Sequence, residues 1–268
     1  MSMRSKLRIS KLQNQNESGL LKIIVDGKLP LRIMVRFGNW IFHYRNFLFP
    51  VFYLLLFIPS PVIFSDYKMS IIIGLLISLG GETVRALVMG LVNISHGGKD
   101  RNIHSSSLIT DGIFSHCRNP LYIGNIMILL GLGIAANSLI FLCVLIPLFV
   151  FFYQAIVRAE EDYLEKSFGA PYVDYKSKVN RWIPELAGMG KTFSTMRFSL
   201  QRVLVKEYNS TYLWMSGAVL VVMKHYWAHH DQDAFVKAVP VFAGTLLFLL
   251  LCYLFIRYMK KSGRWTAD

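Results

Sequence analysis

Three long stretches of the chain carry no charged side chain. They cover residues 47–64, 121–157 and 238–256, and are 18, 37 and 19 residues long. A helix needs roughly 20 apolar residues to cross a bilayer core, so the first and last stretches each predict one crossing. At a rise of about 1.5 Å per residue the middle stretch is too long for one crossing. Because Ala135-Ala136-Asn137-Ser138 lies near its centre, we expect two helices joined by a tight turn there.

The other apolar stretches extend this pattern to a bundle. The sequence predicts further helices over 69–92 and 208–227, and a last one over 236–257. The predicted fold class is all-α, a polytopic membrane helix bundle with about six transmembrane helices. We expect four parts: a basic cytoplasmic N-terminal segment (1–46), a membrane core (47–184), a basic linker (185–206) and a C-terminal two-helix membrane extension (207–268).

Charge supports a membrane protein and gives an orientation. Only 17% of the residues are charged, against about 25% in soluble domains. The net charge is +13, and 25 of the 29 Lys and Arg lie in segments that six crossings place on one side, namely 1–46, 93–118, 158–210 and 257–268. The positive-inside rule therefore predicts an integral multi-pass protein with both termini cytoplasmic, and explains the charge better than nucleic acid would. We expect no disulfide framework, because the three cysteines are odd in number and two lie in apolar stretches.

Two polar segments flank the central hairpin. The first, residues 108–124, contains the turn Thr110-Asp111-Gly112 and then Asn119-Pro120, with proline suited to the first turn of a helix. A helix start offers free N–H groups and a partial positive charge, which suit an anionic part of a ligand. The second begins with Glu160-Glu161-Asp162 where the hairpin ends. Periodicity alone favours a solvated acidic surface there, and the alternative is that Glu160 holds a cation.

Taken together, these segments resemble the isoprenylcysteine carboxyl methyltransferase and phospholipid methyltransferase superfamily of integral membrane enzymes. The resemblance covers about 106–184 and is carried by Arg118-Asn119-Pro120-Leu121-Tyr122-Ile123-Gly124, Glu160-Glu161-Asp162-Tyr163-Leu164 and Phe168-Gly169-Ala170-Pro171-Tyr172-Val173-Asp174-Tyr175. It implies a cofactor pocket at the cytoplasmic face that binds S-adenosyl-L-methionine. It also implies methyl transfer to a lipophilic small-molecule or lipidated substrate, with membrane lipids as partners and neither nucleic acid nor metal.

Roles for individual residues follow from matching positions. We assign catalytic roles to Glu160, Arg158 and Tyr122, and substrate binding to Arg85 and Arg158. The resemblance implies cofactor contacts from Ser106, Ser107, Leu108, Ile109, Phe114, Asn119, Pro120, Tyr122 and Glu160. Asn119 stands where carboxyl methyltransferases usually have His, and Ile156 where they have an Arg. An isoprenylcysteine carboxylate, a lipid amine, a phenol and a thiol are therefore all candidate substrates.

The sequence is also consistent with other functions and with other roles for single residues. A membrane reductase of the sterol-reductase type, using NADPH, shares a distantly similar motif, and a non-catalytic scaffold is a third class. Within the helix over 69–92, Arg85 either pairs with Glu82 or faces the active-site cavity. His225, His229 and His230 resemble one histidine box, but seven histidines in all are too few for a di-iron centre. The membrane would be the inner membrane in a bacterium and the endoplasmic reticulum in a eukaryote.

Overall fold

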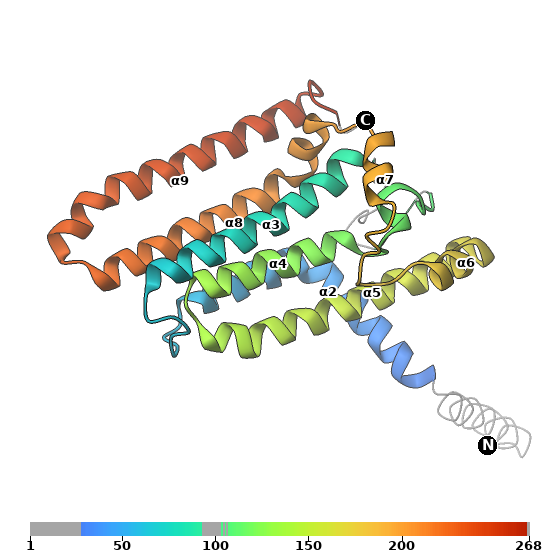
Figure 1. Cartoon of the computed structure of the whole chain (residues 1–268), viewed down its shortest axis with the longest axis horizontal. Helices are drawn as coiled ribbons and strands as arrows, with labels where there is room; N and C mark the ends of the chain where they lie inside the picture. The colour runs from blue at the N-terminus through green and yellow to red at the C-terminus, as the bar shows by residue number, and fades with distance from the viewer. Residues whose placement is uncertain (1–27, 93–102, 104, 106, 267–268) are drawn as a thin grey trace, which may run out of the picture.

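A computed structural model describes residues 28–92, 103, 105 and 107–266 of the chain. Within these residues all regular structure is helical, which confirms the all-α prediction (Figure 1). The helices are α2 (Lys28–Tyr53), α3 (Tyr67–Leu91), α4 (Pro120–Ala135), α5 (Ile146–Phe168), α6 (Ala170–Lys178), α7 (Met189–Thr195), α8 (Leu200–His229) and α9 (Gln232–Lys261). Short turns of other helix types are η1 (Leu54–Phe57), η2 (Gly112–Ser115) and η3 (Phe141–Leu145).

Four helical stretches of the described residues are long and apolar enough to cross a membrane: Leu31–Phe57, Tyr67–Leu91, Phe141–Phe168 and Gln232–Lys261. The two other predicted spans differ for separate reasons. Helix α4 is apolar but has only 16 residues. Helix α8 has 30 residues, but polar and charged side chains such as Glu207 and Lys224 interrupt its apolar face. Both still pack inside the bundle, where α3 contacts α4 on one side and α8 on the other.

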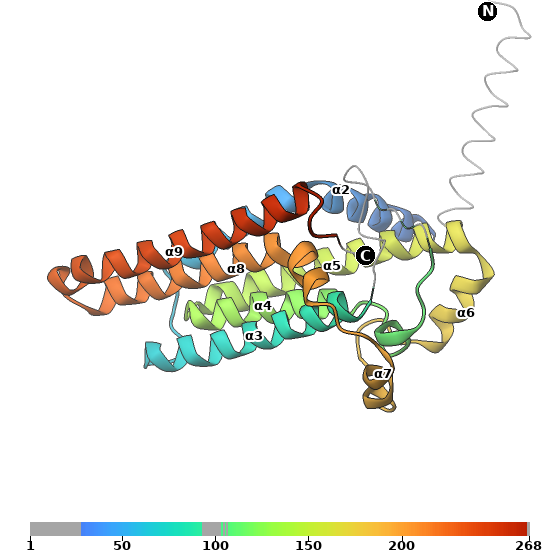
Figure 2. The same cartoon turned by 90° about the horizontal axis from the view of Figure 1, so that it is seen from above.

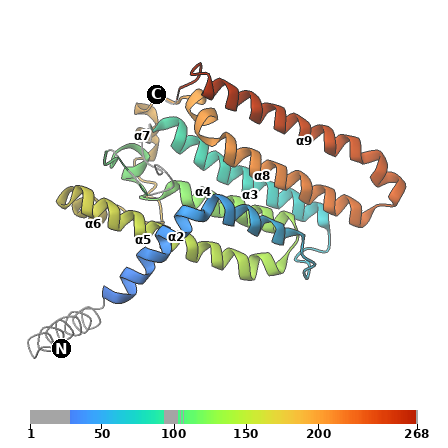
Figure 3. The same ribbon diagram turned by 180° about the vertical axis from the view of Figure 1, so that it is seen from behind.

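The first helix differs from its prediction. We expected a span over 47–64 after a basic segment, whereas α2 begins at Lys28 and its continuation η1 ends at Phe57. The predicted boundary at 46/47 thus falls inside one helix, and Pro59 and Pro61 follow its end. The charges of α2 do not end it, because its buried residues Ile41 and Phe42 pack in the core against α5. Figure 3 shows α2 crossing over α5 and α4.

The central hairpin forms as predicted. Helix α4 ends at Ala135, and Asn137 adopts a left-handed backbone conformation with φ 54°. Its side-chain Oδ1 accepts hydrogen bonds from the backbone N–H of Ile63 (2.8 Å) and of Phe64 (3.0 Å). The turn of the hairpin is thereby joined to the connection between η1 and α3.

Helices α3 and α4 approach each other closely through glycine. A Cβ atom at Gly131 would lie 2.4 Å from the carbonyl oxygen of Gly74, and one at Gly81 would lie 2.6 Å from that of Gly124. Small residues permit this backbone approach between membrane helices. Gly131 therefore serves helix packing.

In the C-terminal pair, α8 packs against α3 and α4, and α9 packs against α8 (Figure 1). Helix α9 has no buried residue and contacts mainly α8. The shorter helices α6 and α7 gather at the end of the bundle where α3 ends and α4 begins (Figure 2). This end also carries both polar segments that flank the hairpin.

Candidate functional site

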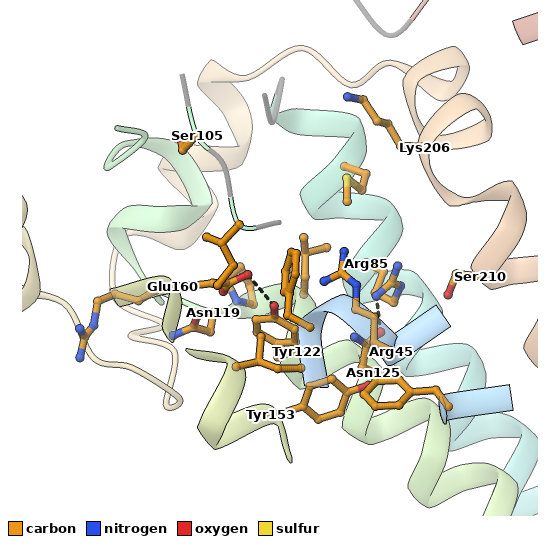
Figure 4. Close-up of a pocket in the computed structure, with 18 of the residues that line it drawn as sticks. Arg45, Arg85, Ser105, Asn119, Tyr122, Asn125, Tyr153, Glu160, Lys206 and Ser210 are labelled. Atoms are coloured by element: carbon orange, nitrogen blue, oxygen red, sulfur yellow. Dashed lines mark hydrogen bonds between the residues drawn. The ribbon is translucent and has the colours of Figure 1, made fainter. Parts of the chain in front are cut away.

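A cavity of about 720 Å³ lies between α2, α3, α4, α5 and α8. Its lining combines apolar and aromatic side chains with a few polar groups, as is typical of small-molecule sites. The polar groups come from all five helices. Figure 4 shows Asn119, Tyr122 and Glu160 close together near the start of α4.

The two ends of the hairpin meet inside this cavity. Tyr122, in the first turn of α4, donates a hydrogen bond from its hydroxyl to Oε1 of Glu160 on α5, at 2.8 Å (Figure 4). The Tyr122 ring also lies 5.1 Å from the ring of Tyr153, one helix away. The convergence of Tyr122 and Glu160 that the sequence motifs predict is therefore present, while their chemical roles stay predictions.

Adjacent Glu161 also lines the cavity, but its carboxylate is bound by two arginines. Its Oε1 accepts from Arg118 Nη1 (2.7 Å) and from Arg181 Nε (2.9 Å), and its Oε2 accepts from Arg181 Nη2 (2.5 Å). The backbone follows the same path, because Arg118 donates its N–H to the carbonyl of Asn180 at 2.9 Å. Glu161 is buried, so the solvated-surface interpretation is wrong for this residue. It applies to Asp162, which pairs with the exposed Lys166.

This clamp fixes the start of α4. Asn119 donates from Nδ2 to the carbonyl of Arg181 at 3.1 Å, and the Cys117 thiol lies 3.6 Å from the same oxygen. Burial raises the pKa of the Cys117 thiol. Cys117 therefore stays protonated at neutral pH and acts as a packing and hydrogen-bonding group, not as a nucleophile.

Helix α6 holds the aromatic side of the cavity. The Tyr175 hydroxyl donates to the backbone carbonyl of Phe114 at 2.7 Å. Burial raises the pKa of both Tyr172 and Tyr175 above the ordinary value, so both remain neutral donors. Phe114 is thereby held as a buried ring in the cavity lining.

The inner wall of the cavity carries a buried ion pair. Arg85 on α3 donates from Nε (2.9 Å) and Nη2 (2.5 Å) to Oε2 of Glu207 on α8, and from Nη1 to Oδ1 of Asn125 on α4. Glu82 does not pair with Arg85: it accepts hydrogen bonds from Thr211 Oγ1 (2.5 Å) and Trp214 Nε1 (3.0 Å) on α8. Arg85 therefore does not pair with Glu82 but lines the cavity, which is the second of the two hypotheses for this residue.

Most predicted site residues reach the cavity. Its lining includes Arg85, Leu108, Ile109, Phe114, Asn119, Pro120, Tyr122 and Glu160. Ser107 is exposed and lies outside the lining, and Ser106 lies outside the described residues. The predictions for Arg158 need a correction, because it is also absent from the lining. It precedes Glu160 by two positions, which places it on another face of α5, whereas Ile156 does line the cavity.

Several residues of the cavity lining are not among those that the sequence predicts for the site. Asn125 follows Tyr122 by three positions, so helical spacing could have placed both on one face of α4. Arg45 on α2 and Asn209 and Ser210 on α8 also line the cavity, and Glu207 lies behind it. No local signal marks these residues, because their elements are distant in sequence from the hairpin.

The described residues contain no group of three or more His, Cys, Asp or Glu side chains able to hold a metal ion. His225 instead pairs through Nε2 with the carbonyl of Ala135, at 2.9 Å, and His229 through Nδ1 with that of His225, also at 2.9 Å.

Comparison with known proteins finds a similarity that covers α3 and the hairpin. Residues 69–171 match the family described as phospholipid methyltransferase. The cobalt-zinc-cadmium resistance protein CzcN of Cupriavidus metallidurans is 34% identical over 129 residues, which are 47% of this chain and 56% of that protein. The nickel-cobalt-cadmium resistance protein NccN of Alcaligenes xylosoxydans xylosoxydans is 30% identical over 130 residues, covering 48% of this chain and 58% of that protein.

A eukaryotic relative carries an enzyme name. Protein-S-isoprenylcysteine O-methyltransferase of Schizosaccharomyces pombe is 35% identical over 128 residues, which are 46% of this chain and 51% of that protein. The chain thus spans somewhat more than half the length of these curated relatives. No solved structure matches it.

Proposed function

Because the chain belongs, through residues 69–171, to the superfamily of phospholipid and isoprenylcysteine methyltransferases, we propose that it is an integral membrane methyltransferase. Its methyl donor is S-adenosyl-L-methionine, and its acceptor is a lipophilic, membrane-soluble substrate. The observation that carries this proposal is the hydrogen bond between Tyr122 and Glu160 inside the cavity. This hydrogen bond connects the motif that contains Tyr122 with the motif that contains Glu160, and both motifs line the same cavity.

The chemistry of the lining fits this donor. Glu160 supplies a carboxylate for an ammonium or sulfonium, and the rings of Phe114 and Tyr122 supply surfaces that attract cations. The start of α4 at Pro120 supplies partial positive charge for a carboxylate. A volume of about 720 Å³ lies within the range of roughly 300–1,000 Å³ found for small-molecule sites.

The donor, when bound, supplies an electrophilic methyl group on a positively charged sulfur. The residues of this chain then need only to bind and orient, and such positioning can account for much of a rate enhancement. Tyr122 keeps the Glu160 carboxylate directed into the cavity. The Glu161 clamp keeps Asn119 and Pro120 in place, and the apolar side chains of Ile128, Leu129 and Ile156 exclude water.

Both termini lie on the cytoplasmic side in this proposal. The ends of α3, α5 and α9 and the starts of α2, α4 and α8 gather at one end of the bundle (Figure 1). Basic segments follow or precede these ends in the sequence, and the positive-inside rule assigns them to the cytoplasm. The donor, a soluble metabolite, then enters from the cytoplasm, while the substrate enters from the lipid.

The direct test measures donor binding and transfer. The full-length protein in lipid nanodiscs is titrated with radiolabelled S-adenosyl-L-methionine and then incubated with a membrane lipid extract, whose labelled product is identified. We expect saturable donor binding and a labelled lipid. Glu160→Gln should weaken donor binding, whereas the matched control Asp162→Asn, whose partner is the exposed Lys166, should not.

Two outcomes contradict the proposal. One is absence of donor binding by a correctly inserted wild-type protein. The other is saturable binding of labelled NADPH in its place, which favours the reductase class. Equal donor affinity in the wild type and in Glu160→Gln removes the assignment of Glu160 alone.

A further inference from the structure

A chain of polar side chains from four helices crosses the inner wall of the cavity. Glu207 on α8 binds Arg85 on α3, and Arg85 binds Asn125 on α4. Asn125 and Tyr153 of α5 both line the cavity. Figure 4 shows Arg85, Asn125 and Tyr153 beside Tyr122, whose ring contacts that of Tyr153. The chain of contacts thus runs from α8 to the place where the hairpin ends meet.

The buried carboxylate of Glu207 costs desolvation free energy at this position. It is 2% exposed, and its Oε1 atom has no hydrogen-bond partner among the described residues. Its Oε2 atom accepts both of its hydrogen bonds from Arg85. A buried ion pair adds little net stability because desolvation offsets its Coulombic attraction, and in some proteins its role is to fix geometry. The geometry fixed here is the orientation of Arg85 along the cavity wall.

The same pair neutralises Arg85. All three guanidinium nitrogens donate to side chains: Nε and Nη2 to Glu207, and Nη1 to Asn125. A carboxylate ligand at this wall would have to displace Glu207 and would meet an ion pair without net charge. The cation of Arg118 is likewise compensated by Glu161. The other two cations of the lining, Arg45 on α2 and the exposed Lys206 on α8, come from different helices than Arg85.

We propose that Glu207 is a positioning residue that acts through Arg85 to orient Asn125, which forms with the neighbouring Tyr153 an uncharged hydrogen-bonding wall for the methyl acceptor. This inference rests on the proposed function and narrows its substrate class: the reacting group is a hydroxyl, phenol, thiol or amine that reacts in its neutral form, not a carboxylate. The lone pair of the acceptor forms the bond to the methyl carbon as the carbon–sulfur bond breaks. The proton of the acceptor passes to the Glu160 carboxylate and from there to water.

Glu207 comes from α8, outside residues 69–171 that match the family. The C-terminal helices therefore form part of the site and of its selectivity. Glu82 provides a matched control, because it also joins α3 to α8 through a carboxylate but contacts neither Arg85 nor the cavity lining.

The first experiment needs no substrate. Thermal unfolding is measured in nanodiscs for Arg85→Gln, Glu207→Gln and the double variant. Glu207→Gln leaves a buried guanidinium without its counterion, so we expect Tm to fall by about 10 °C. The double variant should recover part of this loss, since it removes both charges. Additive losses in the double variant would show that the two residues are not coupled and would overturn the proposal.

The second experiment measures selectivity. Wild type, Glu207→Gln, Glu207→Asp and Glu82→Gln are given labelled donor with dodecylamine, 4-dodecylphenol, dodecanethiol or dodecanoate. We expect the wild type to methylate one of the uncharged acceptors and not dodecanoate. In Glu207→Gln, kcat should fall about 100-fold, as for a small misplacement of reacting groups. The donor affinity of Glu207→Gln should not change, and its use of dodecanoate relative to the other acceptors should rise. Glu207→Asp should recover part of the lost kcat. Glu82→Gln should keep the wild-type acceptor preference.

Preferential methylation of dodecanoate by the wild type would overturn the acceptor class. Unchanged kcat and preference in Glu207→Gln would overturn the positioning role. No donor binding by the wild type would instead refute the proposed function, and the acceptor class with it, while the thermal experiment would still decide whether Glu207 and Arg85 act as a pair.

Discussion

Helix α3 makes two interfaces that are held together by different forces. Against α4 it presents glycines, and the backbones come close enough that a Cβ atom at Gly131 would overlap the carbonyl of Gly74. Against α8 it presents the carboxylate of Glu82 and the guanidinium of Arg85, which bind polar groups on the other helix. The first interface depends on shape and tolerates no added volume. The second depends on charge and hydrogen-bond direction, and it therefore places individual atoms at the cavity.

The largest expected effect tests the glycine interface. Gly131→Val puts branched volume where even one carbon lies within 2.4 Å of backbone, so the helices must separate. We expect a loss of about 3 kcal/mol or more of stability, the upper range for overpacking, seen as loss of monodisperse protein in size-exclusion chromatography. Gly244→Val on α9, where nothing lies within 4 Å, is the control and should behave as wild type. Equal behaviour of the two variants would mean that α3 and α4 are not closely packed.

A slightly smaller effect is expected where the hairpin is clamped. Glu161→Gln removes the shared counterion of Arg118 and Arg181, both of which are largely buried. We expect a loss of about 2–3 kcal/mol, somewhat below the range for breaking a fully buried pair. The measurement is thermal unfolding together with donor affinity, and both should fall because Asn119 and Pro120 lose their support. A fall in stability with unchanged donor affinity would show that the Glu161 ion pairs do not support the cofactor site.

The polar interface should respond more mildly to loss of a neutral donor. Thr211→Val removes one hydrogen bond to Glu82, and interhelical hydrogen bonds in membranes contribute about 0.6 kcal/mol on average and up to roughly 1.7. Thr245→Val is the matched control, because the Thr245 hydroxyl bonds only its own helix at Val241. Thermal unfolding in the same nanodiscs compares the two. A larger loss from Thr245→Val would contradict the assignment of Glu82 to the α3–α8 interface.

The smallest effect concerns alkaline pH. Burial raises the pKa of Tyr175 above its ordinary value of 10.0, so the folded state holds the proton more strongly than the unfolded state. This contribution to stability is complete below about pH 10 and is lost progressively as the pH rises further. Tyr175→Phe should therefore be slightly less stable at pH 8 and should show a shallower decline between pH 9.5 and 11. A steeper decline of stability with pH in Tyr175→Phe than in the wild type would contradict the raised pKa of Tyr175.

The sequence was sufficient for those parts of the fold that depend on local pattern. The hairpin turn at Asn137 follows from a break in a long uncharged run, and the meeting of Tyr122 with Glu160 follows from motif order. Asn125 could also have been predicted, by helical spacing from Tyr122. The start of α2 was missed because Arg45, a charge within an apolar helix, faces the cavity and does not end the span. Glu207 could not be found, since only the packing of α8 on α3 brings it to a residue 122 positions away.

The ion pair between Arg85 and Glu207 also limits how this protein can be shortened. A version of the chain that stops before α8 would leave the guanidinium of Arg85 facing hydrocarbon without a counterion, at a cost of several kcal/mol. The matched segment therefore does not behave as a detachable module here. Anyone who expresses only the part that resembles its relatives should expect aggregation or misinsertion, and a second polypeptide that carries α8 and α9 should restore the folded protein when it is supplied in trans.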